Sequence, residues 1–248
     1  IISGASGHAL HGNADFLGTT IEAARKFGIR HRVLNAREMA EEFPQFMLTG
    51  NERGYFEYDA GFLVPERCVA TQLDLAEKRG AVLRRNERVL RVDQAGAGVE
   101  VVTDKGRYSA AAAIVSAGPW VNGFIPAAAA KHFKVFRQVL HWFDVSSAYE
   151  NYAEGNFPIF IWSVGRWEAD FFYGFPALDG PDGGLKIATE HFQSTTQPDE
   201  ADRNVASGEP AADFTSYISG RLQGVRDRCL KSAVCLYTAT PNSNFVID

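Results

Sequence analysis

Two segments of the chain combine reactive residue types with a strand-like pattern. In the first, Tyr173 is followed by a turn rich in glycine and proline and then by Lys186, which stands between Leu185 and Ile187. The turn predicts a hairpin that places Tyr173 and Lys186 on neighbouring strands. Side chains alternate along a strand, so Lys186 faces away from its two apolar neighbours. Taken alone, such a lysine is best interpreted as part of a solvated face.

The second segment carries Cys235 and Tyr237, which a period of two places on the same face of a strand. An accessible cysteine thiolate is a nucleophile, whereas most strand cysteines are small buried hydrophobic residues. With Cys68 and Cys229, the chain has three cysteines, which is not the even number of a disulfide framework, and their spacing is not that of metal ligands. We therefore expect no metal site and a reducing, cytoplasmic location.

The elements that must position these residues change type along the chain. Apolar residues at helical spacing predict early helices, of which the first ends at Gly28 and the second opens with a capping box of Asn35 and Glu38. After residue 80 the pattern favours short strands, which predicts an α+β fold with a large, mainly antiparallel sheet. The expected helices cover residues 16–28, 35–44, 65–80 and 212–222, and the expected strands cover 81–83, 88–93, 99–103, 107–108, 112–116, 134–144, 157–162, 170–173, 184–189, 233–238 and 244–248.

Composition excludes several classes of protein. The 25 Lys and Arg residues stand against 30 Asp and Glu residues, and the resulting net charge of −5 argues against nucleic-acid binding. The longest apolar run, at 110–115, is far too short to span a bilayer, which needs about 20 residues. We find no phosphate-binding glycine loop, no nucleophile elbow and no zinc-binding helix motif. We therefore expect no membrane and no nucleic-acid partner.

A set of short motifs resembles the monomeric sarcosine oxidase and N-methyltryptophan oxidase family of flavoprotein amine oxidases. Tyr-Gly-Phe-Pro begins at Tyr173, Gly-Leu-Lys ends at Lys186, and Cys-Leu-Tyr-Thr-x-Thr-Pro-x-x-x-Phe-x-Ile-Asp begins at Cys235. The resemblance extends in the same order over nearly the whole chain, to residues 61–63, 114–120 and 137–139.

The resemblance implies a large mixed sheet in a substrate domain, together with an incomplete α/β FAD-binding domain. It assigns residues 1–60 and 126–234 to the substrate domain, 61–125 to part of the FAD-binding domain, and 235–248 to the return towards that domain. The chain starts without Met and stops in a strand-like segment. We therefore expect a fragment that lacks the family's dinucleotide motif and second flavin loop, and that by itself neither holds FAD tightly nor turns over.

The implied reaction is oxidation of the C–N bond of an N-methyl or otherwise N-substituted amino acid, with O2 as acceptor and H2O2 as product. Lys186 matches the family lysine that promotes O2 reduction, because a fixed cation stabilises the developing negative charge. Tyr173 and Tyr237 match tyrosines that line the substrate cavity, and core aromatic residues remain the alternative for both. His191 lies five residues after Lys186 rather than four, so a strand turns it to the opposite face unless a bulge intervenes. Thr189 or Glu190 is the alternative occupant of its place.

The resemblance also implies the residues that bind FAD. Cys235 matches the cysteine that bonds through sulfur to the flavin. Ala117, Gly118 and Trp120 match a strand-end turn near the cofactor, and Val89 matches a residue whose backbone meets the adenine.

Three hypotheses for the function remain open. The first is the oxidase, a monomer in this family; the second is an FAD-dependent dehydrogenase or an oxidase of another amino acid; and the third is a non-catalytic module that associates through exposed apolar surface.

Overall fold

The structure, a computed structural model, describes residues 1–4, 15–165, 170–190, 192, 194–205 and 211–247. The chain divides into two compact units. The first comprises Ile1–Phe62, Phe136–Thr196 and Glu200–Tyr237, and the second comprises Leu63–Val135, Gln197–Asp199 and Thr238–Asp248.

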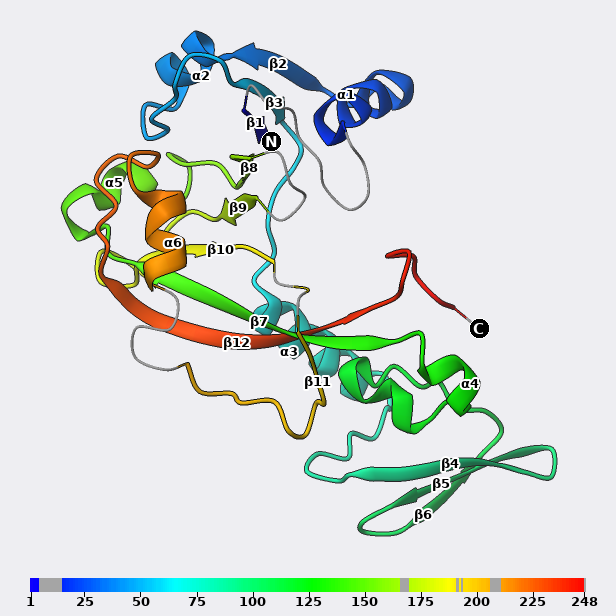
Figure 1. Cartoon of the computed structure of the whole chain (residues 1–248). Coiled ribbons are helices and arrows are strands. Elements are labelled where there is room, and N and C mark those ends of the chain that lie inside the picture. Colours follow the sequence, from blue (N-terminus) through cyan, green and yellow to red (C-terminus); the bar gives the residue numbers. More distant parts are fainter. Residues whose placement is uncertain (5–14, 166–169, 191, 193, 206–210, 248) are drawn as a thin grey trace. The chain divides into compact units, whose positions relative to one another are not determined.

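A sheet organises the first unit (Figure 1). Its strand order is β11-β7-β10-β9-β8-β1-β3-β2, and β12 pairs with β7 beside this path. The pairs β2–β3, β1–β3, β8–β9, β9–β10 and β7–β10 are antiparallel, whereas β1–β8 is parallel. The predicted α+β class with a mainly antiparallel sheet is therefore confirmed. The strands are β1 (Ile2–Ser3), β2 (His31–Asn35), β3 (Arg53–Glu57), β7 (Lys134–Phe143), β8 (Phe160–Ser163), β9 (Phe171–Gly174), β10 (Leu185–Ala188), β11 (Thr195–Thr196) and β12 (Cys229–Ala239).

Local signals explain where the helices of the first unit begin and end. Helix α1 (Phe16–Phe27) is capped by the Asp15 carboxylate, and Gly28 ends it with a φ of 66° that favours glycine. Helix α2 (Ala36–Glu42) opens with the predicted capping box, in which Asn35 and Glu38 exchange hydrogen bonds. Both predictions are confirmed. The remaining helical segments of this unit are η2 (Ser146–Ala148), α5 (Tyr149–Tyr152) and α6 (Ala211–Ile218).

Aromatic residues fill the core beneath β8 and β9. The ring of Phe46 lies 5.2 Å from that of Phe157, 5.3 Å from that of Phe160 and 5.8 Å from that of Trp162, measured between centroids. Trp162 in turn stacks on Phe172 of β9. Each such pair contributes about 0.5–1.5 kcal/mol beyond the burial of its surface. This packing fixes one face of β9 in the core. The opposite face of β9 belongs to the site described below.

The second unit contains a three-stranded meander in the order β4-β5-β6. Its three strands confirm the predicted strands at 88–93, 99–103 and 107–108. Helix α3 begins at Pro65, as predicted, but none of its residues is buried, and Val69 and Leu73 are 55 % and 36 % exposed. The elements of this unit are α3 (Pro65–Lys78), β4 (Val89–Ala95), β5 (Gly98–Thr103), β6 (Arg107–Ala110), η1 (Gly118–Gly123) and α4 (Ala127–Ala130).

Three predicted strands are wrong. Residues 81–83, 112–116 and 244–247 have no strand structure. Ile114 and Ile247 are 95 % and 96 % exposed. A strand needs a neighbour for its backbone hydrogen bonds, and among the described residues no strand pairs with these segments. Their apolar composition therefore does not suffice to make them strands.

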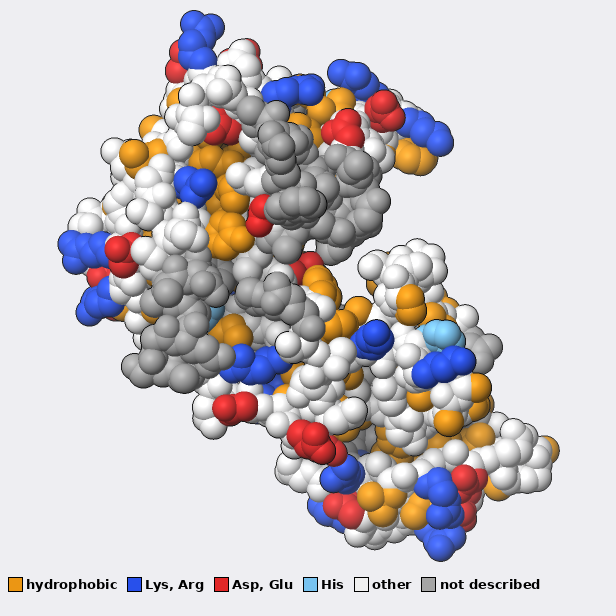
Figure 2. Space-filling model, in the orientation of Figure 1, with side chains coloured by type: hydrophobic (Ala, Val, Ile, Leu, Met, Phe, Trp, Pro, Cys, Tyr) orange, Lys and Arg blue, Asp and Glu red, His pale blue; other side chains and the backbone are white. Residues whose placement is uncertain are grey.

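Charged side chains of both signs are interspersed over the visible face of the molecule (Figure 2), which agrees with the small net charge. In the described part of the chain, no helix has the length and apolar composition needed to cross a membrane.

Candidate functional site

Strands β9 and β10 carry Tyr173 and Lys186, as the hairpin prediction requires. Their register pairs Ala188 with Tyr173, and the Phe175 N–H donates to the Lys186 carbonyl over 3.1 Å. The turn before β10 needs Gly184, whose φ is +79° and where a Cβ atom would lie 3.0 Å from a neighbouring carbonyl oxygen. The hairpin register is thus fixed by backbone geometry next to Lys186.

The Lys186 ammonium group lies among aromatic rings. Its Nζ is 4.9 Å from the centroid of the Phe175 ring and 5.5 Å from that of Trp142. Trp142 is the register partner of Lys186 in the β7–β10 pair, and its ring also lies 4.5 Å from the Nζ of Lys231. Aromatic faces attract cations at these distances. Lys186 therefore lies against aromatic rings and is not a simple surface lysine.

Tyr173 and Tyr237 lie close enough for their phenol groups to affect each other's pKa. Burial raises the pKa of Tyr173, and the interaction with Tyr237 raises it further. Burial also raises the pKa of Tyr237, although its interaction with the Tyr173 side chain acts in the opposite direction. Both phenols consequently remain neutral under physiological conditions and can exchange hydrogen bonds with a ligand.

Cys235 faces the same side of the sheet as this tyrosine pair. On β12, the Ser232 hydroxyl oxygen lies 2.8 Å from Nδ1 of the buried His141. The ammonium group of the preceding residue, Lys231, lies over the Trp142 ring, on the opposite side of β7. Because side chains alternate, Cys235 and Tyr237 share the side of Lys231. The charge that a Cys235 thiolate carries would raise the pKa of Tyr173 and Tyr237. The thiol is half-buried and forms no disulfide. We call the surface formed by Tyr173, Lys186, Trp142, Cys235 and Tyr237 the Lys186 face.

Thr189 and Glu190, the two alternatives to His191, follow directly after β10. Thr189 is buried, and its hydroxyl donates to the Phe171 carbonyl over 2.6 Å. The negative charge of Glu190 raises the pKa of both Tyr173 and Tyr237. His191 lies outside the described residues.

The other residues expected to bind FAD lie in the second unit. Val89 begins β4 and pairs with Thr103. Ala117 and Gly118 lie at the start of η1, where Gly118 has a φ of +53°. Trp120 lies within η1, and its indole N–H donates to Asp199 over 2.7 Å. The structure thus gives Trp120 a structural partner of its own.

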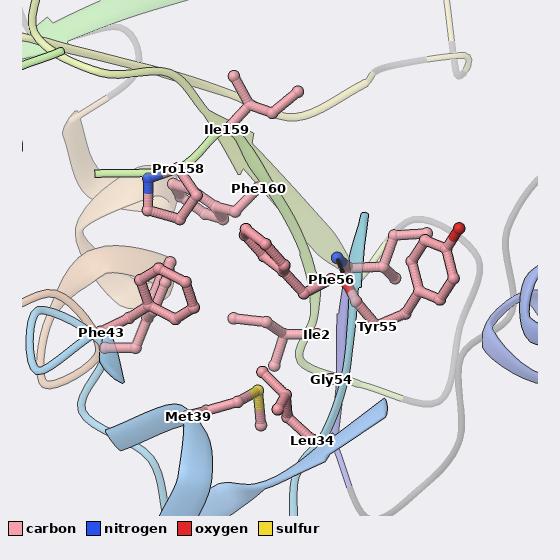
Figure 3. A pocket seen from close by; sticks show the side chains of 12 residues that line it. Ile2, Leu34, Met39, Phe43, Gly54, Tyr55, Phe56, Pro158, Ile159 and Phe160 are labelled. Atoms are coloured by element: carbon pink, nitrogen blue, oxygen red, sulfur yellow. Dashed lines mark hydrogen bonds between the residues drawn. The ribbon is translucent and has the colours of Figure 1, made fainter. Parts of the chain in front are cut away.

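A small apolar cavity lies between β1, β3, α2 and the segment that leads into β8 (Figure 3). It encloses about 40 Å³ and is lined by Ile2, Met39, Phe43 and Phe160, among others. This volume admits a few water molecules at most and is too small for an amino acid or a flavin. It contains none of the predicted site residues, so it is a packing gap in the core.

Sequence reasoning missed Trp142 and Phe175, which surround the Lys186 ammonium. Phe175 could have been found, since the hairpin register follows from the turn. Trp142 could not, because pairing of β7 with β10 joins distant segments. In the described part of the chain, no group of three His, Cys, Asp or Glu side chains could hold a metal ion.

Comparison with known proteins gives the family. The model of the FAD-dependent oxidoreductase family matches residues 6–248. The chain is 31 % identical to a monomeric sarcosine oxidase of Streptomyces avermitilis over 98 % of its own length and 62 % of that protein. It is 30 % identical to an N-methyl-L-tryptophan oxidase of Salmonella dublin over 94 % of its length and 60 % of the relative. The chain thus spans about three fifths of the length of these curated relatives.

The fold also resembles a solved structure. NikD, described as an unusual amino acid oxidase essential for nikkomycin biosynthesis, superposes in its open form with a TM-score of 0.77 and 18 % sequence identity. The superposition covers 96 % of this chain and 60 % of NikD. This likeness concerns the fold, and the motif resemblance at Tyr173, Lys186 and Cys235 agrees with the family match. The chain belongs to the FAD-dependent oxidoreductase family.

Proposed function

We propose that this chain contributes the substrate domain and part of the FAD-binding domain of an oxidase that acts on the C–N bond of an N-methyl or otherwise N-substituted amino acid, with O2 as acceptor and H2O2 as product. The observation that carries the proposal is the Lys186 face, where a lysine between aromatic rings lies beside a neutral tyrosine pair and a free cysteine. Two relatives named as oxidases of N-methylated amino acids support the substrate class.

The residues of the Lys186 face fit a flavin. An isoalloxazine ring is flat and largely apolar, and Trp142, Phe175 and Tyr173 offer aromatic surface around the Lys186 ammonium. The free thiol of Cys235 is the proposed point of covalent attachment. In the second unit, Val89, Ala117, Gly118 and Trp120 are the proposed contacts to the rest of FAD, within the proposed FAD-binding segment 61–125. Residues 1–60 and 126–234 form the proposed substrate domain, and residues 235–248 lead back from it.

Bound FAD would accept the hydride that leaves the carbon next to the amine nitrogen as the C–N bond becomes C=N, and would pass the two electrons on to O2. Lys186 holds a positive charge against the rings of Trp142 and Phe175. Such a charge stabilises the negative charge that develops on O2 when it takes up an electron. The aromatic rings limit the positions open to the flexible lysine side chain, so the charge stays where it is needed.

Tyr173 and Tyr237 would position the substrate. Their phenols are neutral and lie close enough to affect each other's pKa. Aromatic faces attract an amine cation, and a hydroxyl can hydrogen-bond to the substrate carboxylate or nitrogen. The pair thus orients the amine without providing a base.

The test uses the protein at its natural length, loaded with FAD. Release of H2O2 is screened with N-methylated and cyclic amino acids, and the protein is then precipitated with acid. We expect H2O2 from at least one of these amines and flavin in the pellet, as a bond to Cys235 requires. Cys235→Ser should move the flavin to the supernatant. Reduction by amine without H2O2 would instead identify a dehydrogenase, and no flavin reduction by any amine would overturn the proposal.

A further inference from the structure

The carboxylate of Asp199 binds two residues that are distant from it in the sequence. Its Oδ1 accepts a hydrogen bond from the indole N–H of Trp120 over 2.7 Å, and its Oδ2 accepts one from Nη2 of Arg88 over 2.8 Å. Asp199 ends the short segment Gln197–Asp199, which belongs to the second unit although the residues before and after it belong to the first. One carboxylate therefore links three separate segments of the second unit.

Both partners of Asp199 belong to segments that are proposed to contact FAD. Trp120 lies in η1 and is itself a proposed contact, and Arg88 directly precedes Val89, another proposed contact. The Arg88 N–H donates to the Asp104 carboxylate over 3.0 Å, and the Arg88 carbonyl accepts from the Asp104 N–H over 3.0 Å. The backbone before Val89 is thus held by Asp104, while the Arg88 side chain reaches Asp199. Asp199 therefore helps to set the spacing between the two proposed contacts.

The position of the Trp120 ring depends on this hydrogen bond. Trp120 is 41 % exposed, so burial in the core does not fix its ring. The indole nitrogen is its one side-chain hydrogen-bond donor, and Asp199 accepts from it. The hydrogen bond from Trp120 and the charge of Arg88 lower the pKa of Asp199, which keeps the carboxylate ionised at neutral pH. The side chains of Arg88 and Asp199 are 67 % and 57 % exposed, and such an ion pair adds little to stability because water screens it.

We propose that Asp199 is a positioning residue for FAD, which holds Trp120 and the backbone at Val89 in the arrangement that the cofactor requires. The inference rests on the proposed function, in which Trp120 and Val89 contact FAD. A site whose parts are already in place loses less freedom when its ligand binds, so its affinity is higher. Loss of the Asp199 carboxylate should therefore weaken the binding of FAD, while the second unit stays nearly as stable as before.

The experiment measures the affinity for FAD and the stability separately. The protein at its natural length carries Cys235→Ser, so that no covalent bond hides the affinity, and FAD is removed before the titration. The change in flavin fluorescence gives the dissociation constant of FAD, and thermal unfolding without FAD gives the stability. Asp199→Ala is compared with Asp74→Ala as the control. Asp74 forms an ion pair with Lys78 over 2.6 Å on α3 of the same unit, and its side chain is 58 % exposed, like that of Asp199.

Asp199→Ala should raise the dissociation constant of FAD about tenfold, which is the order of the loss when an outer partner of a metal ligand is removed. Asp74→Ala should leave the constant unchanged, and both variants should unfold at nearly the temperature of the parent protein. Asp199→Asn keeps an oxygen for the Trp120 N–H and should restore most of the affinity.

A double-mutant cycle separates positioning from a general effect of the charge. Trp120→Phe removes the indole N–H, so Asp199→Ala should weaken FAD binding much less in that background. An unchanged dissociation constant in Asp199→Ala, or an equal effect with and without the Trp120 indole, overturns the positioning role even though FAD binds. A parent protein that binds no FAD refutes the proposed function instead.

Discussion

Lys186 and Trp142 are direct register partners in the β7–β10 pair, and the lysine Nζ lies 5.5 Å from the centroid of the indole ring. The same ring faces the ammonium of Lys231 at 4.5 Å. The two lysines differ in their surroundings, because Lys231 is 55 % exposed and pairs with Asp179, whereas Lys186 lies between Trp142 and Phe175. This pair of lysines provides an internal control for the role of charge.

The first prediction concerns these two lysines. Lys186→Met in the FAD-loaded protein should slow reoxidation by O2 about a hundredfold, as loss of a preorganised charge does, and should affect reduction by amine far less. Lys231→Met should change neither rate much, since an exposed charge is screened. Stopped-flow absorbance of the flavin measures both half-reactions. Equal slowing of the two half-reactions by Lys186→Met would refute the role of Lys186.

The second prediction concerns the tyrosine pair. Tyr173→Phe removes a partly buried hydroxyl that interacts with the phenol of Tyr237, and it should cost about 1 kcal/mol of unfolding free energy. The double variant with Tyr237→Phe should cost less than the sum of the single variants, because the pair acts as a unit. Urea unfolding measures all three. Strict additivity would show that the two hydroxyls do not interact.

The same pair predicts a pH dependence at high pH. Folding raises the pKa of Tyr173 and of Tyr237. The folded state therefore keeps protons that the unfolded state loses, and stability should fall as pH rises above the ordinary tyrosine pKa of about 10. The double phenylalanine variant should show a smaller fall. Absorbance titration of tyrosinate checks the assignment.

The third prediction concerns the turn before β10. Gly180 and Gly184 have φ values of +77° and +79°, so alanine at either position costs about 1–2 kcal/mol. A Cβ at Gly180 meets nothing, whereas at Gly184 it meets the Phe143 carbonyl and Trp142 within 3.1 Å. Overpacking should therefore add about 1–3 kcal/mol to Gly184→Ala only. Chemical denaturation compares the two variants, and equal costs would contradict this contact.

The fourth prediction concerns Asp144, a buried carboxylate at the end of β7. It accepts a hydrogen bond from the Ser146 N–H and pairs with Arg228 at 3.0 Å, which lowers the pKa of Asp144 to about 2. Its contribution to stability is present above the ordinary aspartate pKa and is lost as pH falls through about 2. Asp144→Asn should lower the unfolding free energy at neutral pH by about 1–3 kcal/mol. Between neutral and acid pH, the unfolding free energy of the variant should fall less steeply than that of the wild type. An equally steep fall would mean that other groups cause the loss of stability in acid.

Local features were predictable from the sequence, because their causes are local. The capping box of Asn35 and Glu38, the stop at Gly28 and the hairpin of Tyr173 and Lys186 all depend on residues close together in the chain. The alternation that places Cys235 beside Tyr237 is a property of any strand. The family resemblance, rather than these patterns, supplied the expected roles of the site residues.

Features that depend on distant partners were not predictable. Strand β1 has two residues, too few for a pattern, and it exists because β3 and β8 flank it. Conversely, the apolar segment 112–116 has the composition of a strand and no partner strand among the described residues. Trp142 reaches Lys186 only through the β7–β10 pairing. In each case the deciding interaction joins segments that no sequence window contains.

The parallel pairing of β1 with β8 joins Ile2 to Trp162 and Ser3 to Ser163. Closing so long a loop costs more chain entropy than forming the β9–β10 hairpin, whose strands are joined by a short turn. Long-range pairings also form late in folding. We therefore expect the strands that carry Tyr173 and Lys186 to assemble first, and the β1–β3–β2 edge to join an already formed site.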